Sequence, residues 1–115
     1  TVSTALAGGL TQEAWTAPTL LNSWVNTGGG QMPAGYYKDS AGTVHLRGRV
    51  QGGTLNTALF TLPAGYRPSA TINFAAISGP GISLGSVYID SSGNVVQQAG
   101  TNAYLMIDGV SFDTR

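Results

Sequence analysis

The side chains that could take part in catalysis or metal binding are few in this chain, and most have a simpler structural explanation. His45 is the only histidine, and spacing places no second ligand or acid–base partner near it, so a surface position beside Tyr37 is expected. Asp39, Asp90 and Asp108 each precede a turn glycine, where a carboxylate accepts hydrogen bonds from local backbone N–H groups. The sequence therefore predicts no metal site and no catalytic histidine.

The other motifs that could support chemistry are incomplete. Glu13 and Asp113 remain as carboxylates, and nothing in the sequence pairs them at the separation that a glycosidase requires. The glycines at 28–30 are not followed by the Lys and the Ser or Thr of a phosphate-binding loop. The Asp-initiated turns lack the terminal Glu of a calcium loop, and no serine is expected to act as a nucleophile. We expect a protein that is not an enzyme and that needs no cofactor.

One group of residues indicates ligand binding instead. Apolar and polar residues alternate over the segment 43–51, which predicts a strand with His45, Arg47 and Arg49 on its polar face. A hairpin with the preceding residues adds Tyr37 to this face. Aromatic rings cover the apolar face of a sugar, and an arginine donates paired hydrogen bonds to hydroxyl or phosphate groups. The candidate ligand-binding residues are therefore Tyr37, His45, Arg47 and Arg49.

Two other interpretations of this face stay open. It would also suit contact with a neighbouring subunit through Arg–Asp pairs, since Asp39 lies close by in the sequence, or it could be an ordinary solvated surface. A second candidate for ligand binding is the pair of loop tips at residues 79–85 and 99–102. Their Gly, Ser and Asn residues offer adaptable hydrogen bonds.

The elements that would position these residues are β-strands. No apolar pattern of helical period persists for ten residues, whereas short alternating runs separated by Gly-rich turns are frequent. This predicts an all-β fold, an antiparallel sandwich or barrel. The segment 62–68, Leu-Pro-Ala-Gly-Tyr-Arg-Pro, predicts a sharp corner between the runs 57–62 and 70–77, because proline cannot continue a ladder.

Turn chemistry predicts three hairpins. In two of them an Asp opens the turn and a Gly three residues later takes a left-handed conformation. The resulting pairs are Tyr37 with His45, Tyr36 with Leu46, Ile89 with Val95, and Val87 with Gln97. In the third, Asp108-Gly109 suits a type I′ turn that would pair Ile107 with Val110 and Leu105 with Phe112.

Gly48 falls on the apolar face of its predicted strand, where its bare backbone leaves room for a large ring from the facing sheet. Trp24 is the expected ring and Trp15 the second choice.

Composition limits the possible partners. The chain has 115 residues, of which only 9% are charged, and its formal net charge is zero, which favours one domain and disfavours nucleic acid or anionic lipid as partners. Cysteine is absent, and no apolar segment approaches the roughly 18 residues of a membrane span. So few charges suggest that identical copies cover part of the surface, although a surface of Thr, Ser, Asn and Gln could also be soluble enough. Thr1–Leu10 is not a signal peptide and is typical of a domain cut from a longer protein.

Four segments together resemble a known family. They are 15–24 (WTAPTLLNSW), 44–48 (VHLRG), 62–68 (LPAGYRP) and 108–112 (DGVSF). The chain is similar over residues 14–113 to the C-terminal knob of minor tail or tail-fibre proteins of long-tailed bacteriophages. Fibres of phage-derived contractile injection systems carry related knobs, and the resemblance does not separate the two.

The resemblance implies a non-enzymatic, homotrimeric, jelly-roll-like β-sandwich at the tip of a virion tail fibre. Residues 14–115 would be this knob and residues 1–13 the end of a stalk. Its partners would be its own copies and a bacterial cell-surface saccharide or cell-wall polymer, with no nucleic acid and no membrane insertion. Two alternatives are a structural trimerisation cap that touches no receptor and a fragment of a carbohydrate-active enzyme. The resemblance supplies no fixed set of ligand residues.

Overall fold

The computed structural model describes residues 12–115, and these form ten β-strands and no helix. The expected stalk, residues 1–13, lies almost entirely outside the described residues. No helix long and apolar enough to cross a membrane occurs within residues 12–115. The strands are β1 (Val25–Asn26), β2 (Gly35–Lys38), β3 (Thr43–Arg47), β4 (Arg49–Gln51), β5 (Ala58–Thr61), β6 (Ile72–Gly79), β7 (Ser83–Ile89), β8 (Asn94–Ala99), β9 (Tyr104–Met106) and β10 (Ser111–Asp113).

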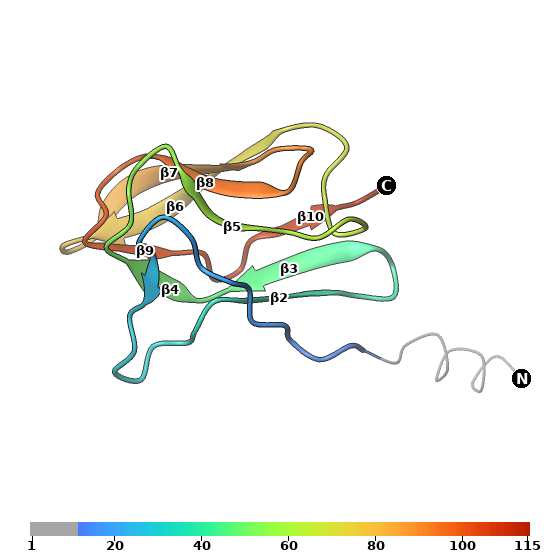
Figure 1. The fold of residues 1–115 in the computed structure, drawn as a ribbon, viewed down its shortest axis with the longest axis horizontal. Helices are drawn as coiled ribbons and strands as arrows, with labels where there is room; N and C mark the ends of the chain where they lie inside the picture. The colour runs from blue at the N-terminus through green and yellow to red at the C-terminus, as the bar shows by residue number, and fades with distance from the viewer. Residues whose placement is uncertain (1–11) are drawn as a thin grey trace, which may run out of the picture.

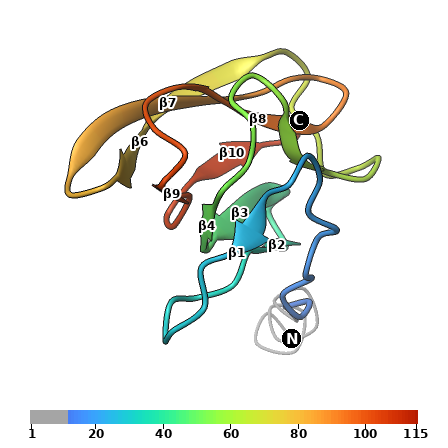
Figure 2. The ribbon, with the colours of Figure 1, turned by 60° about the vertical axis from the view of Figure 1, so that its left-hand side comes forward.

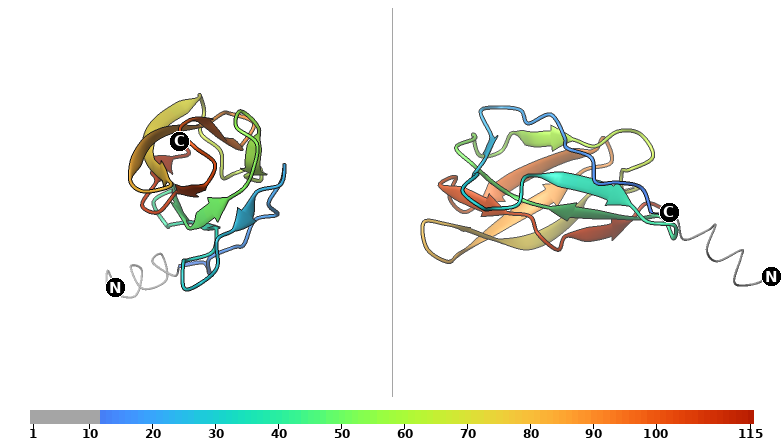
Figure 3. Two further views of the ribbon diagram at one scale, coloured as in Figure 1. Left: turned by 90° about the vertical axis from the view of Figure 1, so that its left-hand side faces the viewer. Right: turned by 90° about the horizontal axis from the view of Figure 1, so that it is seen from below.

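Two antiparallel sheets curl toward each other and form a sandwich-like half-barrel. The larger sheet has the order β1-β4-β9-β6-β7-β8-β5, and the smaller one the order β10-β3-β2. Figure 1 shows the molecule from the side, Figure 2 shows β6–β8 arching over β2 and β3, and the end-on view in Figure 3 shows the rounded cross-section. The prediction of an all-β antiparallel sandwich is confirmed.

A single bent ladder joins the two sheets. β3 pairs with β10 in the small sheet, and after Gly48 the same chain continues as β4, which pairs with β9 in the large sheet. The segment that pairs with it makes the same passage, because β9 leads through residues 107–110 into β10. The Leu46 N–H donates to the Val110 carbonyl and the Ile107 N–H to the Gly48 carbonyl, so the ladder continues through the corner.

The prediction of a hairpin at Asp108-Gly109 is wrong. β9 and β10 do not pair with each other, since they belong to different sheets and both pair with the segment 43–51. The predicted turn does form, since the Val110 N–H donates to the Ile107 carbonyl at 3.4 Å, but the strands beyond it separate. The pairing with residues 43–51 shifts by one residue here, so Asp108-Gly109 also forms a β-bulge at the corner. Gly109 has a φ of 80°, as a bulge glycine does, and the Asp108 carboxylate accepts a hydrogen bond of 2.8 Å from the Gly48 N–H.

The other two hairpins are confirmed with their predicted registers. The observed pairs include Tyr37 with His45, Tyr36 with Leu46, Ile89 with Val95 and Val87 with Gln97. In both turns the N–H of the left-handed glycine donates to the carbonyl of the opening Asp. The same carboxylate also accepts hydrogen bonds from N–H groups two and four residues further on. Turn chemistry is therefore sufficient to set these two registers.

The corner at 62–68 is also present. Gly65 has a φ of 90°, and the Tyr66 N–H donates to the Pro63 carbonyl, which closes a turn between the prolines. The segment leads the chain from β5, at the edge of the large sheet, to β6, on the far side of β7 and β8. It is a crossing between strands that do not pair.

The core fills the space between the sheets with the apolar residues of the alternating runs. Val44 and Leu46 are buried, and so is Val50 beyond the corner. The prediction that an aromatic ring covers Gly48 is wrong. A Cβ there would lie 2.5 Å from the Cα of Ala34, so backbone rather than a side chain covers this glycine. Trp24 is buried over Gly53 instead, where an added Cβ would overlap its ring.

The close packing of backbone at Gly48 predicts that a side chain there destabilises the fold strongly. Gly48→Ala should lower the free energy of unfolding by about 3 kcal/mol, because φ is +126° there and the new Cβ meets the Ala34 backbone. Gly109→Ala is the control, since its φ of +80° is also left-handed but its Cβ would meet no atom within 4 Å; a cost of about 1–2 kcal/mol is expected. Urea denaturation measures both, and equal losses would contradict the close packing at the corner.

Candidate functional site

Four of the chain's polar and aromatic side chains lie together on the outer face of the small sheet. The Tyr37 ring stacks on the His45 ring with centroids 4.8 Å apart, and Trp15 meets Tyr37 edge to face at 4.5 Å. The Arg47 guanidinium lies 4.1 Å from the centroid of the Trp15 ring. We call Trp15, Tyr37, His45 and Arg47 the aromatic row.

Cross-strand pairing places these residues side by side. Tyr37 is directly opposite His45, and Gly35 is opposite Arg47, so two residues of β2 face two of β3. Because Gly35 has no side chain, the space above it is filled by Arg47 and Trp15. Trp15 is held beside β2 by an isolated antiparallel bridge, in which Thr16 and Tyr36 exchange two backbone hydrogen bonds of 2.8 and 3.0 Å.

Asp39 borders the row and binds its histidine. The His45 Nε2 lies 2.8 Å from the Asp39 Oδ2, while Oδ1 accepts hydrogen bonds from the N–H groups of Ala41 and Thr43. The hydrogen bond with His45, followed by the one from Thr43, lowers the pKa of Asp39 below its ordinary value. Asp39 is therefore anionic near neutral pH and fixes the orientation of the imidazole.

Arg49 lies apart from the other three predicted residues. It is in β4, across the corner at Gly48, and its guanidinium stacks 3.8 Å from the centroid of the Tyr104 ring. Directly opposite it on β9 is Met106, so Arg49 belongs to the outer face of the large sheet. The structure thus brings together Tyr37, His45 and Arg47 and adds Trp15. The sequence signal for Trp15 is weak, because its position depends on a bridge 20 residues along the chain.

The corner at 62–68 holds Trp15 in place through its neighbour Glu13. The Tyr66 hydroxyl donates to the Glu13 carboxylate, and the Lys38 N–H donates to the same group at 2.7 Å. Lys38 also reaches the corner, where its ammonium donates to the Gly65 carbonyl and lies over the Tyr66 ring. The N–H of Lys38, and after it the Tyr66 hydroxyl, lower the pKa of Glu13.

The row presents hydrogen-bonding capacity and flat apolar surface together. Two ion pairs occur within residues 12–115, His45–Asp39 and Arg115–Asp113, so Arg47 is in neither. Its Nε is buried and has no hydrogen-bond partner among these residues. Trp15 is 37% exposed. A ring that can cover an apolar ligand face, next to a guanidinium that is in neither of these ion pairs, suits a saccharide or a phosphate-bearing polymer.

One spacing in the chain matches a nucleophile motif that sequence reasoning overlooked. Gly81-Ile82-Ser83-Leu84-Gly85 fits Gly-x-Ser-x-Gly, but Ser83 begins β7 after a tight connection from β6, whereas a nucleophile elbow joins a strand to a helix. His45 lies in the other sheet and is bound to Asp39. The described residues also contain no group of three or more His, Cys, Asp or Glu side chains that could hold a metal ion.

The comparisons with known proteins concern the fold. No protein-family model matches the chain, and no curated protein matches it. A solved structure similar to it is the receptor binding protein gp15 of Listeria phage PSA, with a TM-score of 0.72 and 20% sequence identity. The match covers 96% of this chain and 70% of that one. The chain thus has the fold of a phage receptor binding protein, as the sequence resemblance implied.

The contact between Glu13 and Tyr66 gives a testable pKa. Tyr66→Phe should raise the pKa of Glu13 toward its ordinary value of 4.5, while the Lys38 N–H keeps it below that value. A lowered pKa means that this contact stabilises the fold above pH 4.5 and that the stabilisation is lost as the pH falls through the folded-state pKa. Glu13 is the only glutamate, so carbon-13 NMR reports its titration without ambiguity.

Tyr88→Phe is the control for this titration, because Tyr88 lies on β7 and makes no hydrogen bond to Glu13. It should leave the pKa of Glu13 unchanged. An unchanged Glu13 pKa in Tyr66→Phe would show that the corner at 62–68 does not hold the segment 12–16.

Proposed function

We propose that this chain is the receptor-binding tip domain of a tail fibre of a phage or a phage-derived injection system. It acts in the virion tail, outside the cell, as a homotrimer that binds a bacterial cell-surface saccharide or cell-wall polymer without catalysis. Residues 14–115 are the binding domain, and residues 1–13 end the stalk. The observation that carries the proposal is the likeness of nearly the whole chain to the gp15 receptor binding protein.

The aromatic row supports the choice of ligand. Trp15 and Tyr37 offer ring faces and edges of the kind that cover a pyranose, and Arg47 supplies donors without an ion-pair partner among residues 12–115. The chain's zero net charge disfavours nucleic acid, whose binding depends on accumulated positive charge. Three copies on one fibre would raise a weak affinity for a repeating polymer through effective concentration.

The second candidate function is a trimerisation cap that ends the fibre without touching a receptor. The observation that favours it is the modest size of the row, which holds one arginine and three rings. A stable trimer that binds no host-type glycan and no host cell wall would support this function and contradict receptor binding.

Substitutions in the row test the proposed function. Arg47→Ala and Tyr37→Ala should each weaken binding of the chain to host cell wall at least tenfold, about 1.4 kcal/mol, because each removes a direct ligand contact. Both side chains lie on an outer face, so the thermal unfolding midpoint should change little. Isothermal titration with purified cell-wall polymer measures the affinity.

Two arginine variants are controls. Arg115→Ala removes an exposed guanidinium that is already paired with Asp113, and binding should stay within twofold of the wild type. Arg49→Ala should have a smaller effect than Arg47→Ala, because Arg49 stacks on Tyr104 outside the row. Undiminished binding after Arg47→Ala, with loss of the trimer, would identify the row as a subunit contact.

A further inference from the structure

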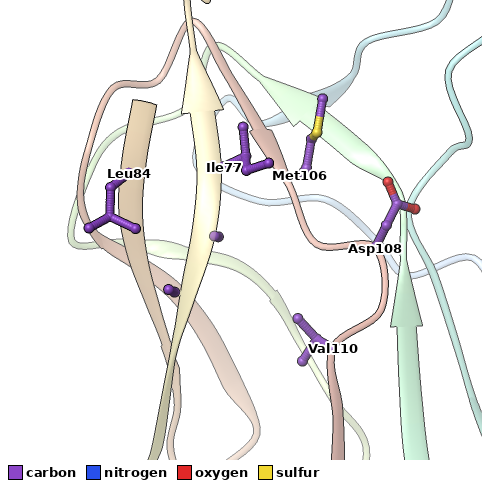
Figure 4. Close-up of a pocket in the computed structure, with 7 residues that line it drawn as sticks. Ile77, Leu84, Met106, Asp108 and Val110 are labelled. Atoms are coloured by element: carbon purple, nitrogen blue, oxygen red, sulfur yellow. The ribbon is translucent and has the colours of Figure 1, made fainter. Parts of the chain in front are cut away.

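A groove opens on the outer face of the large sheet beside β6 and reaches the corner segment at Asp108 and Val110. It has a volume of about 390 Å³ and is lined by Ala75, Ala76, Ile77, Leu84, Met106, Asp108 and Val110. Figure 4 shows Leu84, Ile77 and Met106 in a row across β7, β6 and β9. Cross-strand pairing explains the row, because Ile77 is directly opposite Leu84 on one side and Met106 on the other.

This face exposes large aliphatic side chains where an outer sheet face usually carries polar ones. Ile77 is 42% exposed and Leu84 79% exposed, and Ile82, in the connection between β6 and β7, is 88% exposed. The buried side chains of β6 and β7 point to the other face, so Ile77 and Leu84 contribute little to the core. A contiguous exposed apolar surface of this kind usually marks a contact with another molecule.

The lining of the groove disfavours a saccharide or an anionic polymer as the occupant. The side chains are aliphatic apart from Met106 and Asp108, and no aromatic ring lines it. The Asp108 Oδ1 already accepts a hydrogen bond from the Gly48 N–H. Asp108 also places a carboxylate at the groove, which would repel a phosphate-bearing ligand. An apolar protein surface is the better chemical match.

The distribution of charge favours a second copy of this chain as that surface. None of the residues of β9, β6 and β7, the strands of this face, is charged, and β8 and β5 beyond them are also uncharged. The charged groups beside the face are Asp108 at the groove and Arg49 of β4, which stacks on Tyr104 of β9. A partner with an ordinary charged surface would have to bury several unpaired charges here, which is costly. The one carboxylate of the groove, Asp108, keeps its hydrogen bond from the Gly48 N–H when an apolar surface covers the neighbouring side chains. The chain's own surface is as poor in charge as the groove requires.

We propose that copies of this chain associate through the outer face of β9, β6 and β7. The side chains of Ile82 and Leu84 then pack against the groove of the neighbouring copy. The inference rests on the proposed function for the presence of a trimer and adds the surface that holds it. Figure 2 shows β6 and β7 on the opposite side of the molecule from β2 and β3, so association leaves the aromatic row open to a receptor.

The mass of the intact assembly tests this surface. Native mass spectrometry of the 115-residue chain should show a trimer, and Leu84→Glu should shift it to monomer, with at least a hundredfold weaker association, because a charge would be buried in an apolar contact. Leu84 is mostly exposed in the single chain, so circular dichroism and the unfolding midpoint should stay close to those of the wild type. Ile77→Glu is the second variant and should act in the same way.

Val25→Glu is the matched control, because Val25 is 51% exposed and lies on β1, at the edge of the same sheet and outside the groove. It should leave the trimer intact. A monomeric wild type, a trimer that persists in Leu84→Glu, or a trimer that Val25→Glu disrupts equally would each overturn the proposal.

Cell-wall binding separates this inference from the proposed function. A monomeric Leu84→Glu chain should bind purified polymer with unchanged single-site affinity but adsorb to whole cells less well than the trimer. Loss of single-site affinity with an intact trimer would make the groove a receptor site instead and overturn the inference. If the wild type binds no polymer, receptor binding fails while the mass measurement still decides the subunit contact.

Discussion

The bent ladder between residues 43–51 and 104–113 is the constraint on which the rest of the structure depends. Both segments of this ladder pass from the small sheet to the large one, so the ladder fixes the angle between the two layers. Its corner works because Gly48 brings backbone against the Ala34 backbone and because Asp108 accepts a hydrogen bond from the Gly48 N–H. The bend at this corner sets the directions in which the outward side chains of β3 and β4 point. Arg47 and Arg49, two residues apart, lie on different sheets for this reason.

The two outer faces that the ladder separates have different chemistry. The face of the small sheet carries stacked rings and Arg47, which suit a polar ligand with flat apolar patches. The groove between β7, β6 and β9 is lined by aliphatic side chains, Met106 and Asp108 and by no basic residue, which suits a protein surface. The proposed function needs both kinds of surface, one for other copies of the chain and one for the host. The proposed division of labour follows from this contrast.

The sequence predicted what short-range chemistry decides and missed what long-range pairing decides. The hairpins at Asp39 and Asp90 were predictable to the residue, because an Asp and a Gly three positions later set both the turn and the register. Asp108-Gly109 forms the predicted turn but no hairpin, since both flanking strands find partners in the segment 43–51. Alternation correctly placed Val44, Leu46 and Val50 in the core, yet it cannot reveal a change of sheet at Gly48. Trp15 joined the row through the Thr16–Tyr36 bridge, which no local pattern encodes.

The attachment of the segment 12–16 also determines how the domain would respond to tension. A pull on the chain from its N-terminal side reaches Glu13 and the single Thr16–Tyr36 bridge before it reaches any strand of the small sheet. These few bonds would yield by peeling, one after another, while β2 and β3 stay paired. Trp15 would then leave Arg47 and carry away one wall of the aromatic row. An adhesive contact built on that wall would weaken under load well before the domain unfolds, so the same short segment that completes the row would also act as its mechanical release.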